Sequence, residues 1–138
     1  MTNFKRLLTL MLCLGIMLSV FASTVNASND AITPRANNVA NTYSDFYISG
    51  SEAVVRLSYD GYNGVTTGAR ITTVLQKRNL LVFWKDVTEW VDTSSNISDY
   101  FEHRYSVANG TYRVRITYEI SGTGGATDVI EDEIKASS

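Results

Sequence analysis

The sequence predicts an all-β protein, an antiparallel β-sandwich of the immunoglobulin or fibronectin-III kind. Three observations predict it: short segments with two-residue alternation, turn signals at regular spacing between them, and no stretch with a sustained helical period. About seven such segments occupy the chain from Tyr43 onward. Strands spaced this closely, without helices between them, favour two packed antiparallel sheets over a parallel α/β fold.

The clearest strands lie at residues 52–60 and 111–120. Each places apolar side chains at every second position, which is typical of an antiparallel strand that is buried on one face. The other predicted strands are rich in β-branched and aromatic residues, and they cover residues 44–49, 70–78, 80–87, 100–107 and 127–134. The turn signals are DGYNG from Asp60, ANG from Ala108 and SGTGG from Ser121.

Four tyrosines fall in phase with apolar neighbours and are predicted to belong to the core: Tyr59, Tyr105, Tyr112 and Tyr118. The stretch NGTYRVRITYEI resembles the corner between strands E and F of immunoglobulin-like sandwiches. In those folds a tyrosine at the start of strand F bonds back to the backbone. Tyr112 occupies that position, and the resemblance implies a structural role for it.

More broadly, the chain resembles a group of small exported single-domain β-sandwich proteins of Gram-positive bacteria, whose function is unknown. They share a Q-K…W-x-x-V-x-x-W/Y stretch followed by Y-x-V-x-x-G-x-Y-R-V. The matching residues here are Gln76, Lys77, Trp84, Val87 and Trp90, then Tyr105, Val107, Gly110, Tyr112, Arg113 and Val114. The resemblance implies export and the sandwich fold, and it implies no activity.

The N-terminus has the three-part pattern of a secretory signal peptide. Lys5 and Arg6 precede an apolar run over residues 7–22, and Val25 and Ala27 occupy the −3 and −1 positions of a cleavage site. We therefore expect cleavage after Ala27 and secretion of the remainder. The alternative is an uncleaved N-terminal anchor, although the run is short for a helix that spans a bilayer.

The predicted organisation has three parts: a signal-peptide helix at 1–27, a polar flexible leader at 28–42 and the sandwich domain at 43–138. Cys13, the only cysteine, lies in the first part, so the exported chain has no thiol for a disulfide, a zinc site or a nucleophile. The formal charge of −2 becomes more negative once the basic N-terminus is removed. This balance argues against nucleic acid as a partner. Without another long apolar run, we expect no stable membrane insertion after cleavage.

Catalytic and metal chemistry have few candidate residues. His103 is the only histidine, it lies within a predicted strand, and no nucleophile-elbow pattern is near it. The acidic groups near Asp92 and Asp128 match no calcium-binding loop, and turn formation explains them more simply. We therefore expect no catalysis, no metal and no cofactor. A small hydrolase that uses carboxylates such as Asp99 and Glu102 is the less favoured alternative.

Aromatic side chains are the remaining candidates for a binding site. The chain holds eight tyrosines and two tryptophans, and those out of phase with the core pattern are expected on the surface. The candidate ligand-binding residues are Trp90, Tyr100, Tyr62 and Tyr47. They favour a non-catalytic extracellular module that binds a glycan or a protein. The alternatives are a structural surface, matrix or self-assembling protein, and scattered surface aromatics without a ligand.

Both tryptophans lie in the segment FWKDVTEW. Strict alternation places Trp84 and Trp90 on one face and Val87 on the other. If Val87 is also buried, a β-bulge must intervene near Lys85 and Asp86. We assign Trp84 to the core between the sheets because it follows apolar residues, and Trp90 to the surface because it borders a polar loop. This assignment predicts that Trp84→Ala destabilises the protein more than Trp90→Ala.

Overall fold

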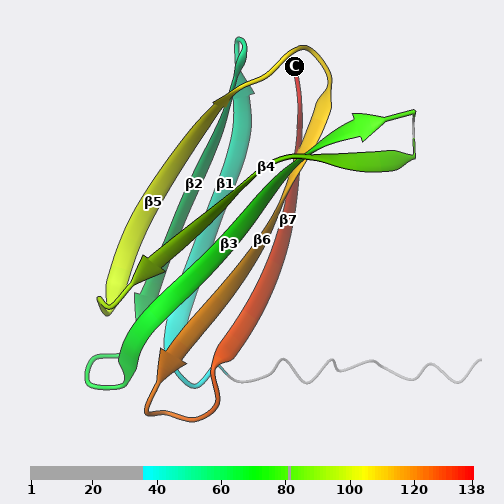
Figure 1. Ribbon diagram of the computed structural model, residues 1–138. Coiled ribbons are helices and arrows are strands. Elements are labelled where there is room, and N and C mark those ends of the chain that lie inside the picture. The colour runs from blue at the N-terminus through cyan, green and yellow to red at the C-terminus, as the bar shows by residue number, and fades with distance from the viewer. Residues whose placement is uncertain (1–35, 81) are drawn as a thin grey trace, which may run out of the picture. The chain divides into compact units, whose positions relative to one another are not determined.

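The computed structural model describes residues 36–80 and 82–138, which form seven strands in two antiparallel sheets (Figure 1). The strands are β1 (Val39–Ser49), β2 (Glu52–Gly61), β3 (Thr66–Asn79), β4 (Phe83–Ser94), β5 (Ser98–Ser106), β6 (Thr111–Gly122) and β7 (Asp128–Ser137). The predicted all-β sandwich is confirmed. In the described ranges no helix is long and apolar enough to cross a membrane. The expected signal peptide and Cys13 lie outside these ranges.

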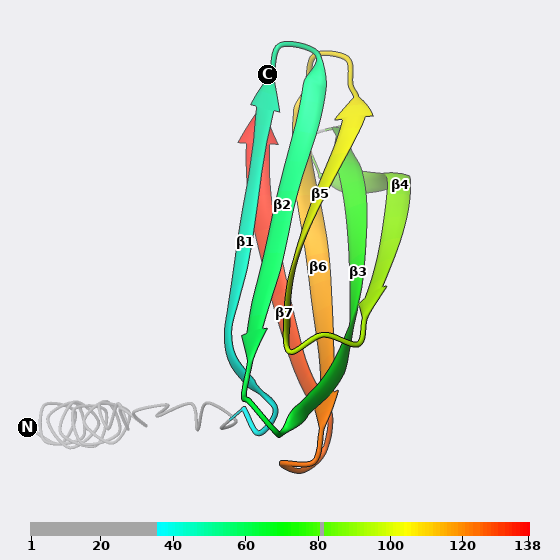
Figure 2. The same ribbon diagram turned by 90° about the vertical axis from the view of Figure 1, so that its left-hand side faces the viewer.

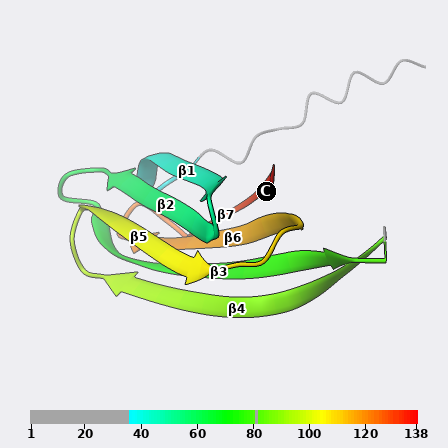
Figure 3. The same ribbon diagram turned by 90° about the horizontal axis from the view of Figure 1, so that it is seen from above.

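One sheet has the strand order β1-β2-β5 and the other has the order β4-β3-β6-β7. Neighbouring strands are antiparallel in every ladder. The two sheets lie face to face (Figure 3), and the chain crosses between them after β2, after β4 and after β5. This is the connectivity of the fibronectin-III-like sandwich that the alternating segments predict.

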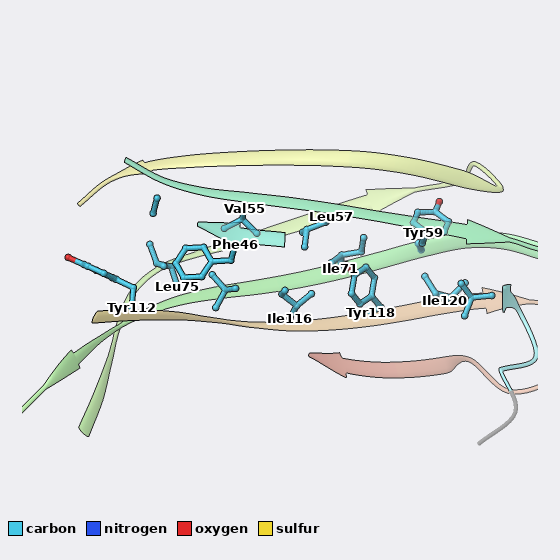
Figure 4. Packing of buried hydrophobic residues seen from close by; sticks show 14 of the residues in the cluster. Phe46, Val55, Leu57, Tyr59, Ile71, Leu75, Tyr112, Ile116, Tyr118 and Ile120 are labelled. Atoms are coloured by element: carbon cyan, nitrogen blue, oxygen red, sulfur yellow. The ribbon is translucent and has the colours of Figure 1, made fainter. Parts of the chain in front are cut away.

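Alternate side chains from both sheets fill the space between the sheets (Figure 4). The predicted inner faces of β2 and β6 are buried, as their two-residue alternation requires. The buried apolar core consists of Val39, Phe46, Ala53, Val55, Leu57, Tyr59, Ala69, Ile71, Leu75, Val107, Tyr112, Val114, Ile116, Tyr118 and Ile120. Because the described domain contains no disulfide, burial of this surface, at about 25 cal/mol per Å², is the main force that holds the sheets together.

Tyr112 lies at the start of β6 with its ring buried, where the resemblance places it. Its hydroxyl donates a 2.7 Å hydrogen bond to the carbonyl of Ala108, in the connection from β5, and so closes a tyrosine corner. Tyr59 and Tyr118 are also in the core. Tyr105 is not, since 39% of it is exposed. Its strand, β5, lies at the edge of the three-stranded sheet, where inward-pointing side chains are less well covered.

The first strand begins earlier than predicted. β1 starts at Val39, inside the expected flexible leader 28–42, and Asn38 just before it is fully buried. The carboxylate of Asp128 accepts the backbone N–H groups of residues 37–39 at 2.9, 2.6 and 3.1 Å. Hydrogen bonds to a distant carboxylate hold this segment together with the burial of Val39, and a hydrophobic pattern gives no sign of such bonds.

β4 carries a β-bulge, as burial of Val87 requires. The ladder between β3 and β4 shifts by one residue, and Val87 is the extra residue. Its side chain is partly buried against the core. The bulge therefore lies directly beside the position predicted for it, near Lys85 and Asp86. Because side chains alternate along a strand, one extra residue places Trp84 and Trp90 on opposite faces of the sheet.

Candidate binding face on the three-stranded sheet

The two tryptophans occupy the opposite positions from those predicted. Trp90 points inward and packs against the core, and its ring stacks on His103 with the ring centroids 4.9 Å apart and 9° between the planes. Trp84 lies on the outer face of the four-stranded sheet, where the guanidinium carbon of Arg113 is 4.4 Å from its ring centroid. The structure thus corrects both assignments. The polar loop after Trp90 does not determine on which face of the sheet Trp90 lies. The bulge at Val87 places Trp84 on the outer face.

His103 also contacts Asp92, so a polar pair lies beside Trp90. The imidazole Nε2–H donates to Asp92 Oδ2 at 2.7 Å, and the two side chains are only 18% and 14% exposed. Since β4 and β5 belong to different sheets, this bond ties the sheets together. Among the residues that the structure describes, the hydrogen bond of His103 is the one to Asp92.

The outer face of the β1-β2-β5 sheet, seen from the front in Figure 2, gathers tyrosines from strands that are far apart in the sequence. The ladders place Tyr43 of β1 and Tyr100 of β5 on either side of Ser58 in β2. The two tyrosines are 54% and 55% exposed. Two strand spacings, roughly 10 Å, separate their backbones, and only a small serine side chain stands between them.

A row of charged groups adjoins these tyrosines. Arg56 Nε lies 2.9 Å from Glu102 Oε2, and Arg104 Nη2 lies 2.7 Å from Glu102 Oε1. The hydroxyl of Tyr100 donates to Glu102 Oε2 at 3.2 Å. The guanidinium carbon of Arg56 lies 5.2 Å from the ring centroid of Tyr47. These contacts hold the charged groups in place beside the exposed rings. We name the whole surface the tyrosine face and define it as Tyr43, Tyr47, Arg56, Ser58, Tyr100 and Glu102.

The fold does not bring together Asp99 and Glu102, the carboxylates of the alternative hydrolase hypothesis. Asp99 and Glu102 lie on opposite faces of β5, since they are three positions apart in a regular strand. Hydrogen bonds from Arg56 and then Arg104 lower the pKa of Glu102 from 4.5 to about 2. The hydrogen bond from Ser94 is the main cause that lowers the pKa of Asp99. A general acid in glycoside hydrolysis needs a raised pKa, so both groups are suited to accept hydrogen bonds rather than to donate a proton.

We expect the carboxyl of Glu102 to titrate with a midpoint of about 2, and an NMR titration of this carboxyl is the measurement that checks it. Because its pKa is lowered in the fold, the stabilisation from its ion pairs is present above the ordinary value of 4.5 and is lost as the pH falls toward 2. Arg56→Met should move the midpoint upward. Arg70→Met, which removes a guanidinium that faces Glu119 instead, is the matched control. A midpoint that Arg56→Met leaves unchanged would contradict this cause.

Of the four predicted ligand-binding aromatics, the structure brings two, Tyr47 and Tyr100, onto the tyrosine face. Tyr62 is 43% exposed but lies in the turn after β2, outside the tyrosine face. Trp90 faces the interior. Tyr43 also lies on this face but is not among the residues predicted from the sequence, where it marks only the start of the patterned region. The signal that could have found it is the shared phase of Tyr43 and Tyr47, opposite to the buried phenylalanine of the same strand.

Fold and site together define the described part of the chain as a β-sandwich with an exposed face of tyrosines and fixed charges. No family model matches the sequence, and no curated protein matches it. Among solved structures it is similar to wild-type OgpA from Akkermansia muciniphila, with 10% identity and a TM-score of 0.43 over 70% of this chain and 28% of that chain.

A second similar structure is catalytic inactive OgpA from the same organism in complex with an O-glycopeptide substrate, with 11% identity and a TM-score of 0.42 over 75% of this chain and 31% of that chain. A third is a beta-glucosidase from Listeria innocua in complex with gluconolactone, with 9% identity and a TM-score of 0.42 over 71% and 16% of the two chains. The chain therefore spans less than a third of each of these proteins. A likeness this weak assigns neither a family nor an activity, and the resemblance to exported Gram-positive proteins stays a prediction.

Proposed function

We propose that the protein is a secreted, non-catalytic module that binds a glycan through the tyrosine face. The observation that carries this proposal is the row of Tyr43, Ser58 and Tyr100 across three strands. An exposed tyrosine offers a flat apolar ring for the C–H face of a sugar, and its hydroxyl offers a hydrogen bond at the rim. The serine between the two rings leaves room for a chain of sugar units to lie across the sheet.

The fixed charges support the same function. Sugar hydroxyls both donate and accept hydrogen bonds, and Glu102 and Arg56 present an ionised acceptor and an ionised donor side by side. Hydrogen bonds that involve an ionised group are stronger than neutral ones. Because these side chains are already held by one another in the free protein, little conformational entropy is lost when a ligand binds.

Substitution of either exposed tyrosine is expected to weaken glycan binding. We expect Tyr43→Ala and Tyr100→Ala each to raise the dissociation constant about 5- to 30-fold, equivalent to about 1–2 kcal/mol. The measurement is retention on insoluble peptidoglycan, chitin and cellulose, followed by titration against soluble fragments of the polymer that retains the protein. Tyr62→Ala removes an exposed tyrosine that lies outside the tyrosine face, and it is the matched control.

Two results would overturn this proposal: no retention of the wild-type protein on any of the three polymers, or an equal loss for Tyr62→Ala. Size-exclusion chromatography over a range of concentrations tests the alternative of a self-assembling matrix protein. A glycan-binding module of this kind needs no second copy, so the tyrosine substitutions should leave the elution volume unchanged. Capture of a protein in place of a glycan would support the protein-binding alternative.

A further inference from the structure

The hairpin that joins β3 and β4 extends beyond the two sheets (Figures 1 and 3). Its tip holds the three most exposed large apolar residues of the described chain: Leu80, Val82 and Phe83 are 78%, 74% and 68% exposed. The sequence analysis expected a strand over 80–87, but β4 begins only at Phe83. Contiguous apolar surface of this kind is uncommon in soluble proteins and marks a site of contact with a partner or a membrane.

Turn geometry does not explain these apolar residues. Leu80 has a φ of 47°, in the left-handed region that glycine or asparagine adopts at lower cost than leucine. The N–H of Val82 donates to the carbonyl of Leu80 at 2.7 Å, a bond between backbone atoms that requires no particular side chain. Hairpin turns usually hold Gly, Asn or Asp, which suit both the backbone and water. Leucine at position 80 therefore costs conformational free energy that glycine or asparagine would avoid.

Cations lie directly behind the tip. Lys77 of β3 is paired with Lys85 of β4 in the ladder, and Arg78 follows Lys77. Like charges directly opposite each other destabilise a pair of strands. Within the described part of the chain, neither lysine forms an ion pair with a carboxylate, and the ammonium of Lys77 lies 5.4 Å from the ring centroid of Tyr112. No aspartate or glutamate occurs from residue 77 to residue 85, although the chain as a whole is acidic.

Trp84 lies between the apolar tip and the cations. It is half-buried on the outer face of the sheet, with Arg113 against its ring. An indole ring is apolar in its body and polar at its N–H, so it is favoured at the boundary between hydrocarbon and water. Apolar tip, tryptophan and cationic base thus follow one another along the hairpin in the order in which a membrane interface presents acyl chains, carbonyl region and headgroups.

We propose that the β3–β4 hairpin docks the protein on the surface of an anionic lipid bilayer. Leu80, Val82 and Phe83 enter the boundary between headgroups and acyl chains, while Lys77 and Lys85 face the anionic headgroups. The net negative charge of the chain does not prevent this, because salt screens charges that lie more than about 10 Å from the surface. The docking is peripheral and reversible. It is independent of the tyrosine face, which lies on the other sheet.

The test uses vesicles of phosphatidylcholine alone and vesicles that also contain phosphatidylglycerol. The wild-type protein should co-sediment with the anionic vesicles and much less with the neutral ones. The triple variant Leu80→Ser, Val82→Ser, Phe83→Ser should bind anionic vesicles at least about tenfold more weakly, since it loses three apolar side chains that leave water on docking. The double variant Lys77→Glu, Lys85→Glu should lose the preference for phosphatidylglycerol.

Control variants keep the result specific to the hairpin. Ile97→Ser with Val129→Ser removes exposed apolar side chains elsewhere on the surface and should leave vesicle binding unchanged. Lipids brominated along the acyl chain should quench tryptophan fluorescence in the wild type but not in Trp84→Phe, where only the inward-facing Trp90 remains. All variants are compared in the same form of the chain, so differences among them report the substituted residues, and circular dichroism verifies that each is folded.

Three results would overturn the proposal. The wild-type protein binds no vesicles, or the triple variant binds as tightly as the wild type, or Trp84 is not quenched by acyl-chain bromine. Concentration-dependent self-association that the triple variant abolishes, without vesicle binding, would show that a second copy of the chain covers the tip instead.

Discussion

Trp90→Ala is expected to lower the free energy of unfolding by about 3 kcal/mol. The ring packs against the core, stacks on His103 and meets Tyr105 edge-on with the centroids 6.4 Å apart. Its removal leaves a cavity between β4 and β5 and opens the bond between His103 and Asp92 to water. The loss therefore combines lost burial, lost ring contacts and a weaker tie between the two sheets.

Trp84→Ala is the matched control for this prediction. It removes the same side chain from the same strand, but from the outer face, where the main contact is the guanidinium of Arg113. Trp84 is half-buried and the Arg113 side chain is only 19% exposed, so this cation–π contact contributes on the order of 1–2 kcal/mol, still less than the loss expected for Trp90→Ala. Urea unfolding followed by circular dichroism compares the two variants without relying on the deleted fluorophore. Equal losses, or a larger loss for Trp84→Ala, would show that the core does not depend on Trp90.

Asp128→Ala is expected to have the second large effect, again about 3 kcal/mol. The carboxylate accepts three successive backbone N–H groups, from residues 37–39, and both it and Asn38 are buried. Hydrogen bonds to an ionised acceptor are strong, and the N–H groups of Asn38 and Val39 are buried, so leaving them without an acceptor is costly. The start of β1 would then lose its attachment to β7.

Two further variants separate this role from a general effect of charge. Asp128→Asn keeps one acceptor oxygen and should cost less than Asp128→Ala. Glu131→Ala removes an exposed carboxylate from the same strand and should leave the free energy of unfolding nearly unchanged. Hydrogen exchange should show faster exchange of the amides of residues 37–39 in Asp128→Ala. Retained protection of these amides would contradict the role of Asp128.

The fold could be predicted because the central strands β2 and β6 are each buried on the face toward the other sheet. Burial on one face leaves a two-residue period in the sequence, and residues 52–60 and 111–120 display it clearly. The attachment of β1 could not be predicted in the same way. Asn38 and Asp128 are polar residues about 90 positions apart, and hydrogen bonds between such distant partners leave no local pattern.

The candidate site was predictable only in part, because it depends on register between strands. The surface phase of Tyr47 and Tyr100 is visible within their own segments. That Tyr43 and Tyr100 flank the same serine follows from two ladders, and a single sequence does not specify which residues pair. For the tryptophans, the sequence predicts a bulge if Val87 is buried. It does not specify which face of the sheet each indole ring then occupies.

Because Val87 is an extra residue in the ladder, the number of residues in β4 determines which face of the sheet the side chains before Val87 occupy. A substitution in this strand changes one side chain and leaves all others on the faces they occupy. Deletion of one residue at the bulge would restore plain alternation in β4. The side chains from Phe83 to Asp86 would then exchange the two faces of the sheet. During divergence, therefore, residues 83–86 should accept replacements of side chains more readily than insertions or deletions of a single residue.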